Sequence, residues 1–305
     1  MIGLVFALIG TLIIPVAVMA ALEPSLYKSA PRVENYRGRM VYNGLGIVWF
    51  VWLAAFWIGV QLLAALGLEL PYWAEYLKPL SVVLAGACAF GMFDDWAGDR
   101  QITGFSGHLR AMLRGHITTG GLKFLGIGFL SLFLAVSLYF DGAGSIPRVL
   151  LVTCVVALGA NTMNLFDLRP GRAGKMYLLG LVFAFACIIF GGVLTAFDWQ
   201  GLVALALAAL GPLVAVWRFD LRERGMLGDA GANPLGVFLG FLCASSLPLW
   251  ALTIVAVALV AVNLLSERVS FTKIIAGNRL LSALDELGRV KNTQQAELFD
   301  QEVGR

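Results

Sequence analysis

Two adjacent carboxylates, Asp94 and Asp95, follow an apolar run from Leu80 to Phe93. Such a run is typical of a membrane helix, and acidic residues are costly to place at its mouth. Neighbouring carboxylates repel each other unless a cation or a shared proton offsets the repulsion. Mg²⁺ suits this role, because it favours oxygen ligands and keeps coordination positions for water and substrate phosphates. The pair therefore predicts a metal-and-phosphate site at a membrane face.

A second polar group ends another apolar run. Asn161, Asn164 and Asp167 are spaced three residues apart, so they share one helix face. Two amides and a carboxylate on one stripe suit a polar cavity inside a helical bundle better than lipid. The alternative is that these amides form hydrogen bonds between helices, which is a common use of Asn in membranes.

The stretch Gly228-Asp229-Ala230-Gly231 forms a third group, a few residues before Pro234. A carboxylate at a helix N-terminus could be a simple cap. Backbone N–H groups flanked by glycine at a helix start also bind anions, which would suit a phosphate beside a metal. Basic residues follow the second group and occur on other expected inner loops; those after the second group could hold phosphate, and the others could be the positive charge expected on the cytoplasmic side of a membrane protein. These basic residues are Arg37 and Arg39 (with Asn35), Lys123, Arg169, Arg172 and Lys175.

The composition predicts the elements that must position these residues. Of 305 residues, 59% are hydrophobic and 13% are charged, which is typical of polytopic membrane proteins and excludes an ordinary soluble domain. A helix needs about 20 apolar residues to cross the hydrocarbon. We therefore predict an all-α bundle of about nine transmembrane helices in residues 1–265 and a cytoplasmic tail in residues 266–305. The expected spans are 2–22, 41–67, 77–93, 120–139, 147–165, 176–195, 201–217, 232–247 and 249–265.

The distribution of Lys and Arg predicts the orientation. With nine spans and a cytoplasmic C-terminus, only Lys78 and Arg148 of the 22 basic residues lie outside. The N-terminus is then outside, and the protein is a multi-pass protein of the inner (plasma) membrane. In the tail, Leu280, Leu284 and Leu287 have the spacing of an amphipathic helix on the inner surface. The four cysteines lie in apolar spans, without a disulfide framework or zinc spacing.

Four landmarks on the expected inner loops resemble the polyprenyl-phosphate N-acetylhexosamine-1-phosphate transferase family, which includes the phospho-N-acetylmuramoyl-pentapeptide transferases. The resemblance covers nearly the whole chain, and each landmark alone is weak. The landmarks are Asn35-Tyr36-Arg37-Gly38-Arg39, Asp94-Asp95, Asn161-x-x-Asn164-x-x-Asp167 and Gly228-Asp229-Ala230-Gly231.

The resemblance implies a Mg²⁺-dependent transfer of a sugar-1-phosphate from a nucleotide-sugar, commonly a UDP-sugar, to polyprenyl phosphate in cell-envelope glycan synthesis. The implied partners are those two substrates and the membrane, with no nucleic acid and with a homodimer left open. Implied roles are metal binding for Asp229 and Asp95, and catalysis for Asp94, Asp95, Asn164 and Asp167. The implied substrate-binding residues are Asn35, Arg37, Arg39, Lys123, Asn161, Arg169, Arg172, Lys175 and Met226.

The chain departs from this family on the nucleotide-sugar side. Asp167 is followed by Leu168-Arg169-Pro170-Gly171 where relatives often have Asp-Gly-x-Asp-Gly, and Met226 stands where the peptidoglycan enzymes have an aromatic residue. No histidine follows Ser266, so the histidine-rich loop has no counterpart. A non-catalytic relative that binds or translocates polyprenyl phosphate or another anionic lipid is therefore an alternative. An ion-coupled transporter fits less well, because transporter sites usually lie near the bilayer midplane.

Overall fold

The computed structural model describes residues 1–98, 102, 104–191 and 198–290. The first half of the chain contains α1 (Ile2–Phe6), the π-helical segment η1 (Ala7–Ile13), α2 (Ile14–Ser29), β1 (Arg32–Glu34), β2 (Met40–Asn43), the 3₁₀ turn η2 (Leu45–Ile47), α3 (Val48–Ala65), α4 (Tyr72–Ala97), α5 (Phe105–Leu113) and α6 (Thr119–Tyr139). The second half contains the 3₁₀ turn η3 (Ala143–Ser145), α7 (Ile146–Phe166), α8 (Arg172–Gly191), α9 (Trp199–Leu221), β3 (Gly225–Met226), α10 (Gly228–Ser246), α11 (Leu249–Ser266), α12 (Phe271–Gly277) and α13 (Arg279–Glu286).

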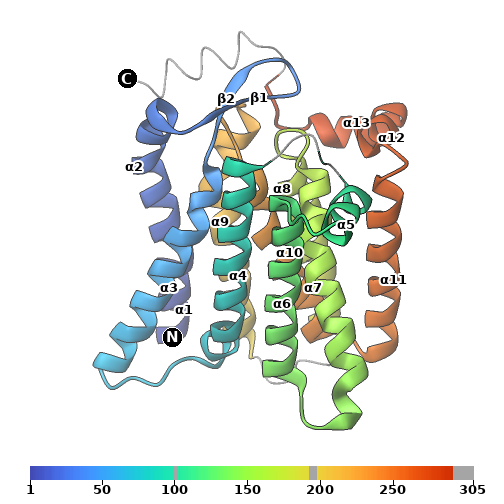
Figure 1. Ribbon diagram of the computed structural model, residues 1–305. Coiled ribbons are helices and arrows are strands. Elements are labelled where there is room, and N and C mark those ends of the chain that lie inside the picture. Colours follow the sequence, from blue (N-terminus) through green and yellow to red (C-terminus); the bar gives the residue numbers. More distant parts are fainter. Residues whose placement is uncertain (99–101, 103, 192–197, 291–305) are drawn as a thin grey trace.

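The long helices run side by side between two ends of one bundle (Figure 1). The end that carries β1, β2, α5, α12 and α13 is called the polar end below. Met1 lies at the other end of the bundle from α13, as an odd number of crossings requires (Figure 1). The expected tail beyond Val290, and the end of the expected span 176–195, lie outside the described residues.

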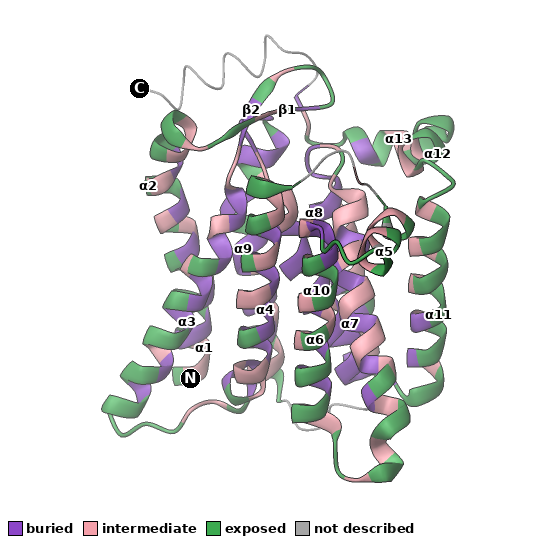
Figure 2. Cartoon of the chain, viewed as in Figure 1, coloured by how far each residue is buried: buried purple, intermediate pink, exposed green. Residues whose placement is uncertain are grey.

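Eight helical segments in the described ranges are long and apolar enough to cross a membrane. They coincide with eight of the nine expected spans and confirm the predicted all-α, multi-pass bundle. The first of them is the continuous segment α1-η1-α2, which extends past the expected end to Ser29. Exposed residues lie on the outside of the bundle (Figure 2), and many of them are large and apolar, as contact with lipid requires.

The ninth expected span, 232–247, corresponds to α10 and is the centre of the bundle. Nearly all of its residues are buried, and it packs against α7, α4 and α8 (Figure 2). Because α10 contacts other helices instead of lipid, it needs small residues for close packing more than it needs high hydrophobicity. This explains why α10 falls outside the set of strongly apolar helices.

The contact between α10 and α7 depends on glycine. A Cβ atom on Gly236 would lie 2.2 Å from the backbone oxygen of Gly159, and one on Gly240 would lie 2.8 Å from the Cα atom of Val156. Glycines four residues apart let two helix backbones approach closely in a membrane. The separation of α7 and α10 is therefore set by residues without side chains.

Replacing Gly236 with alanine should lower the free energy of unfolding by about 1–3 kcal/mol, because overpacking a tight contact forces the two backbones apart. Thermal unfolding of the detergent-solubilised protein measures this loss. The matched control is Gly128→Ala in α6, where a Cβ atom would meet nothing within 4 Å. That control should be neutral or stabilising, and equal destabilisation by both substitutions would contradict the prediction.

A small sheet at the polar end joins segments that are distant in sequence. β1 and β2 form an antiparallel hairpin, and β3 pairs in parallel with β2 through Tyr42 opposite Gly225 and Asn43 opposite Met226. The sequence analysis did not predict these short strands. Their effect is to attach the first polar loop to the residues immediately before α10.

Candidate functional site

Three carboxylates and one ammonium group meet at the polar end, and we call them the acidic centre. Asp94 and Asp95 come from the last turns of α4, Asp229 from the first turn of α10, and Lys123 from the first turns of α6. Lys123 Nζ lies 2.7 Å from Asp94 Oδ2 and also forms an ion pair with Asp229. Two landmarks far apart in sequence are thus brought together, with Lys123 between them.

The local structure of α6 explains the placement of Lys123. Thr118 caps this helix, since its Oγ1 accepts a hydrogen bond of 3.0 Å from the backbone N–H of Gly121. His108 of α5 approaches the same hydroxyl, with 2.7 Å between its Nδ1 and Thr118 Oγ1. The helix therefore starts at a defined point, one turn before Lys123.

Asp95 holds the start of α10. Its Oδ1 accepts from the backbone N–H of Asp229 at 3.1 Å, and its Oδ2 accepts from that of Ala230 at 3.0 Å. The helix α10 is therefore capped by a residue of α4, and Asp229 does not cap its own helix. Both oxygens of Asp95 thus accept backbone hydrogen bonds, which gives this residue a positioning role at the start of α10, and its expected metal-ligand role stays a prediction.

The remaining carboxylates, Asp94 and Asp229, fit a magnesium ion. In the described residues, no group of three or more His, Cys, Asp or Glu side chains is arranged to hold a metal. Mg²⁺ does not require such a group, because it is commonly held by one or two carboxylates together with water and substrate phosphates. Asp94 and Asp229 already converge on one cation, the ammonium of Lys123. Two carboxylates directed at a common cation are compatible with one of the donor sets that hold Mg²⁺ in proteins.

The expected stripe on α7 divides between two environments. Asp167 follows the last residue of α7 and accepts a hydrogen bond from the backbone of Gly228, next to Asp229. Burial, together with the carboxylates of Asp220 and Asp229, raises the pKa of Asp167 well above its usual value. Asn164 is half-buried near the end of the same helix. Asp167 thus borders the acidic centre.

Asn161 faces a different helix. Its amide donates to Asn263 Oδ1 of α11, and Asn263 in turn donates to Thr162 Oγ1 at 2.8 Å. The alternative explanation, hydrogen bonding between membrane helices, therefore describes Asn161.

The expected phosphate-binding residues after α7 surround a carboxylate of α13. Arg172 is buried and makes two hydrogen bonds to Asp285, of 2.8 and 2.9 Å. Lys175 donates to the backbone oxygen of Asp285 at 2.6 Å, and Arg169 lies 4.0 Å from its carboxylate. These cations therefore contact α13. The sequence analysis had predicted that they bind substrate. Burial by itself opposes ionisation of Asp285, but the hydrogen bonds from Arg172 and Arg289 outweigh it and lower the pKa of this carboxyl to about 2.

Asp285 should therefore make the docking of α13 sensitive to acid. An unfolded aspartate has a pKa near ~3.9, so the stabilisation is present above about pH 4 and is lost as the pH falls towards 2. At neutral pH, Asp285→Asn should speed hydrogen exchange of the α13 amides at least about tenfold, since hydrogen bonds to charged groups contribute roughly 1.5–3 kcal/mol each. Glu286→Gln, at an exposed neighbour, is the matched control. Equal exchange in both variants would contradict the role of Asp285.

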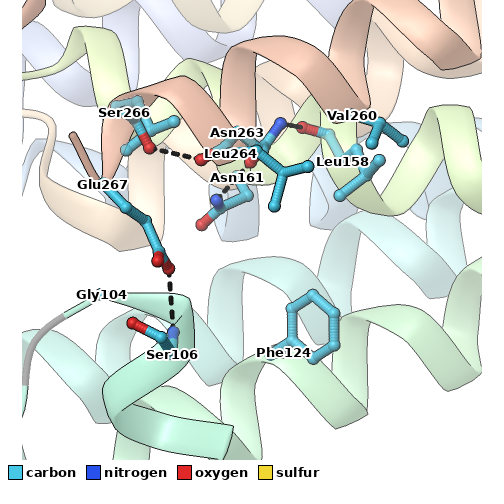
Figure 3. A pocket seen from close by; sticks show the side chains of 11 residues that line it. Gly104, Ser106, Phe124, Leu158, Asn161, Val260, Asn263, Leu264, Ser266 and Glu267 are labelled. Atoms are coloured by element: carbon cyan, nitrogen blue, oxygen red, sulfur yellow. Dashed lines mark hydrogen bonds between the residues drawn. The ribbon is translucent and has the colours of Figure 1, made fainter. Parts of the chain in front are cut away.

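A groove with a mixed apolar and polar lining lies beside α11. It has a volume of about 580 Å³ and lies between α6, α7 and α11, and its lining includes Phe124, Leu158, Val260 and Leu264 (Figure 3). At one side Glu267 accepts a hydrogen bond of 2.8 Å from the backbone N–H of Ser106 (Figure 3).

A smaller cavity continues from this groove. It has a volume of about 110 Å³, shares Gly104, Phe124 and Asn161 with the groove, and is also lined by Lys123 and Asn233. The two spaces are therefore neighbours, and the smaller one is bordered by Lys123.

Several buried charges at the polar end were not selected from the sequence. Glu23 forms a buried ion pair with Arg224, and Asp220 Oδ2 accepts a hydrogen bond of 2.8 Å from the backbone N–H of Gly171. Glu223 is contacted by the first polar loop, where Asn35, Arg37 and Arg39 had been expected to bind substrate. Only Glu23 left a usable signal, as a lone charge at the end of an apolar run.

Comparison with models of known protein families finds no match for this chain, and comparison with curated proteins finds none either. The family resemblance therefore rests on the four sequence landmarks.

Proposed function

We propose that this protein transfers a sugar-1-phosphate from a nucleotide-sugar, commonly a UDP-sugar, to polyprenyl phosphate. The reaction would take place at the polar end, which faces the cytoplasm of the inner (plasma) membrane in the orientation that the Lys and Arg residues favour. The observation that carries the proposal is the convergence of Asp94 and Asp229 on Lys123, at the end of an apolar bundle and beside a partly apolar groove.

The groove between α6, α7 and α11 suits the acceptor lipid. The apolar part of its lining can hold part of an isoprenoid chain, and Lys123 is among the residues that line the smaller cavity. A lysine ammonium binds phosphate as a point charge. The acceptor phosphate would therefore reach the acidic centre from the membrane without its chain entering water.

The proposed reaction needs charge neutralisation and alignment more than covalent help from the protein. An oxygen of polyprenyl phosphate attacks the β-phosphorus of the nucleotide-sugar, and the bond from that phosphorus to the oxygen bridging the two phosphates breaks. The products are polyprenyl diphospho-sugar and a nucleoside monophosphate. Lys123 would hold the acceptor phosphate, and Asp95 would keep Asp229 in place through the start of α10. Mg²⁺ held by Asp94 and Asp229 would supply the charge neutralisation on the diphosphate.

A lipid-binding protein without turnover is the second candidate. One observation favours it: the ammonium of Lys123 already lies between Asp94 and Asp229, where a divalent cation would have to bind. Such a protein would bind polyprenyl phosphate or another anionic lipid through the same groove and would need no divalent ion.

Purified protein distinguishes the two functions. It is incubated with polyprenyl phosphate, Mg²⁺ and a panel of nucleotide-sugars, and the release of nucleoside monophosphate is measured. The transferase proposal expects release from at least one donor and its loss in EDTA. Binding of polyprenyl phosphate that EDTA leaves undiminished, without release from any donor, would instead establish the second candidate.

A further inference from the structure

Glu223, in the turn between α9 and β3, is the meeting point of the first polar loop. Its side chain is fully buried and accepts a hydrogen bond of 3.0 Å from Asn35 Nδ2 and one of 3.3 Å from the Tyr36 hydroxyl. The guanidinium of Arg37 lies 3.2 Å from Glu223 Oε1, and Arg39 donates to the backbone oxygen of Glu223 at 3.2 Å. Four residues of one loop thus contact a single glutamate.

The loop itself is built to present these groups. Asn35 Oδ1 accepts hydrogen bonds of 2.9 and 3.0 Å from the backbone N–H groups of Arg37 and Arg39. This ring of bonds closes the turn at the tip of the β1–β2 hairpin and leaves Asn35 Nδ2 directed at Glu223. The amide of Asn35 is therefore fully engaged inside the protein.

The backbone of Glu223 adopts a conformation that is unfavourable for its residue type. Its φ angle is +55°, in the left-handed region that glycine or asparagine occupies most easily. Holding a long side chain there is unfavourable, and such conformations persist when the surrounding contacts over-determine them. The contacts to the buried carboxylate supply that constraint, which explains a glutamate at a position where glycine would be unstrained.

The position of Glu223 is transmitted to the acidic centre along a short path. The next residue, Arg224, is fixed by its buried ion pair with Glu23, and β3 follows at once and pairs with β2. In that pairing Asn43 lies opposite Met226, and the side chain of Asn43 also forms a hydrogen bond with Asp95. Gly228 and Asp229 then begin α10.

We propose that Glu223 is a positioning residue. The contacts from the first polar loop to Glu223 fix the positions of Met226 and Asp229. Asn35 and Arg37 then act through Glu223 and do not contact substrate. The catalytic consequence rests on the proposed transferase function, whereas the structural coupling does not. The expected substrate-binding role of the first loop is thereby replaced by an internal one.

A double-mutant cycle on the full-length protein separates the two roles. The variants are Glu223→Gln, Arg37→Ala and their combination, and the readouts are kcat and the donor KM for nucleoside monophosphate release. Glu223→Gln should lower kcat about 100-fold, since a displacement near 1 Å at a reacting centre can cost that much. Arg37→Ala should then have no further effect in the Glu223→Gln background. The matched control is Glu75→Gln, at the opposite end of α4, where Glu75 pairs with Lys78 at 2.6 Å.

If Arg37→Ala instead raises the donor KM by the same factor in both backgrounds, Arg37 binds substrate directly and the proposal is overturned. Should Glu223→Gln fail to fold, the same cycle is run with Glu223→Asp, which keeps the charge and shortens its reach. Thermal unfolding of each variant shows whether a loss of activity follows a loss of fold.

A second readout is independent of activity. Met226→Cys is introduced into the natural sequence and into the Glu223→Gln and Glu75→Gln variants, and labelling by a water-soluble maleimide is timed. Labelling at least about tenfold faster only with Glu223→Gln supports the coupling, because opening of the β2–β3 pairing exposes residue 226. Unchanged labelling overturns it. If the natural sequence releases no nucleoside monophosphate with any donor, the transferase proposal fails while this labelling result still decides the role of Glu223.

Discussion

Replacing Asp229 with asparagine is expected to lower the rate of nucleoside monophosphate release by about a hundred- to a thousandfold. The substitution preserves the shape of the side chain and removes one of the two carboxylates that converge on a single cation at the acidic centre. A neutral amide binds a divalent cation and the Lys123 ammonium more weakly than a carboxylate does. The measurement is kcat at saturating donor and acceptor, over a range of Mg²⁺ concentrations.

The control for this substitution is Asp198→Asn. Asp198 caps α9 by accepting a hydrogen bond of 2.8 Å from the backbone N–H of Gly201, and an asparagine oxygen can accept the same bond. This variant should retain the activity of the natural sequence. Full activity in Asp229→Asn would remove Asp229 from the reaction and leave the transferase proposal without its main support.

Replacing Lys123 with methionine is expected to have the second largest effect and to change how the protein responds to Mg²⁺. Without the ammonium, the carboxylates of Asp94 and Asp229 face each other without a cation, and like charges in a partly buried site repel. Breaking a buried ion pair on one side typically costs about 3–5 kcal/mol, and the partial exposure of this site places the loss at the lower end. Turnover should also fall, because the acceptor phosphate loses its binding group.

The stability of Lys123→Met should rise with Mg²⁺, more than that of the natural sequence does. A ligand that binds only the folded state stabilises it by about 2.7 kcal/mol at a concentration 100 times its Kd. Thermal unfolding with Mg²⁺ and with EDTA measures this gain without any substrate. Lys78→Met, which removes a half-buried lysine from the pair with Glu75, is the control and should show no such response. If the thermal stability of Lys123→Met does not change with Mg²⁺, Asp94 and Asp229 do not form a divalent-cation site.

The architecture could be predicted from the amino-acid sequence alone, because whether a segment crosses a membrane depends on the summed hydrophobicity of that segment. Backbone polar groups in lipid must be satisfied within each segment, so an apolar run of sufficient length becomes a helix whatever it packs against. Eight of nine expected spans met this condition directly. The ninth, α10, was found despite its weaker hydropathy, and the structure shows the reason in its burial among other helices.

The same local logic identified the ends of α4, α7 and α10 as polar positions, because charged residues there are incompatible with lipid. It could not identify which polar groups meet. Asn161 and Asp167 have equivalent spacing in the sequence, yet one faces Asn263 of α11 and the other borders Gly228. At 3.6 residues per turn these two residues lie about 120° apart around the helix, and Asp167 lies just past the end of α7, so they meet different neighbours.

Which charged residues contact one another depends on how helices that are far apart in the sequence pack together. Arg172 resembles a phosphate-binding residue by type and neighbourhood, but α13 brings Asp285 to it. Asp95 resembles a metal ligand, and the close approach of α4 and α10 also makes it the cap of α10. Glu223 carries no sequence signal, because its role arises from a hairpin that folds back onto it. The side chain determines which chemistry a residue can perform. Its interaction partner depends on which helices are in contact, and those contacts are a property of the whole bundle.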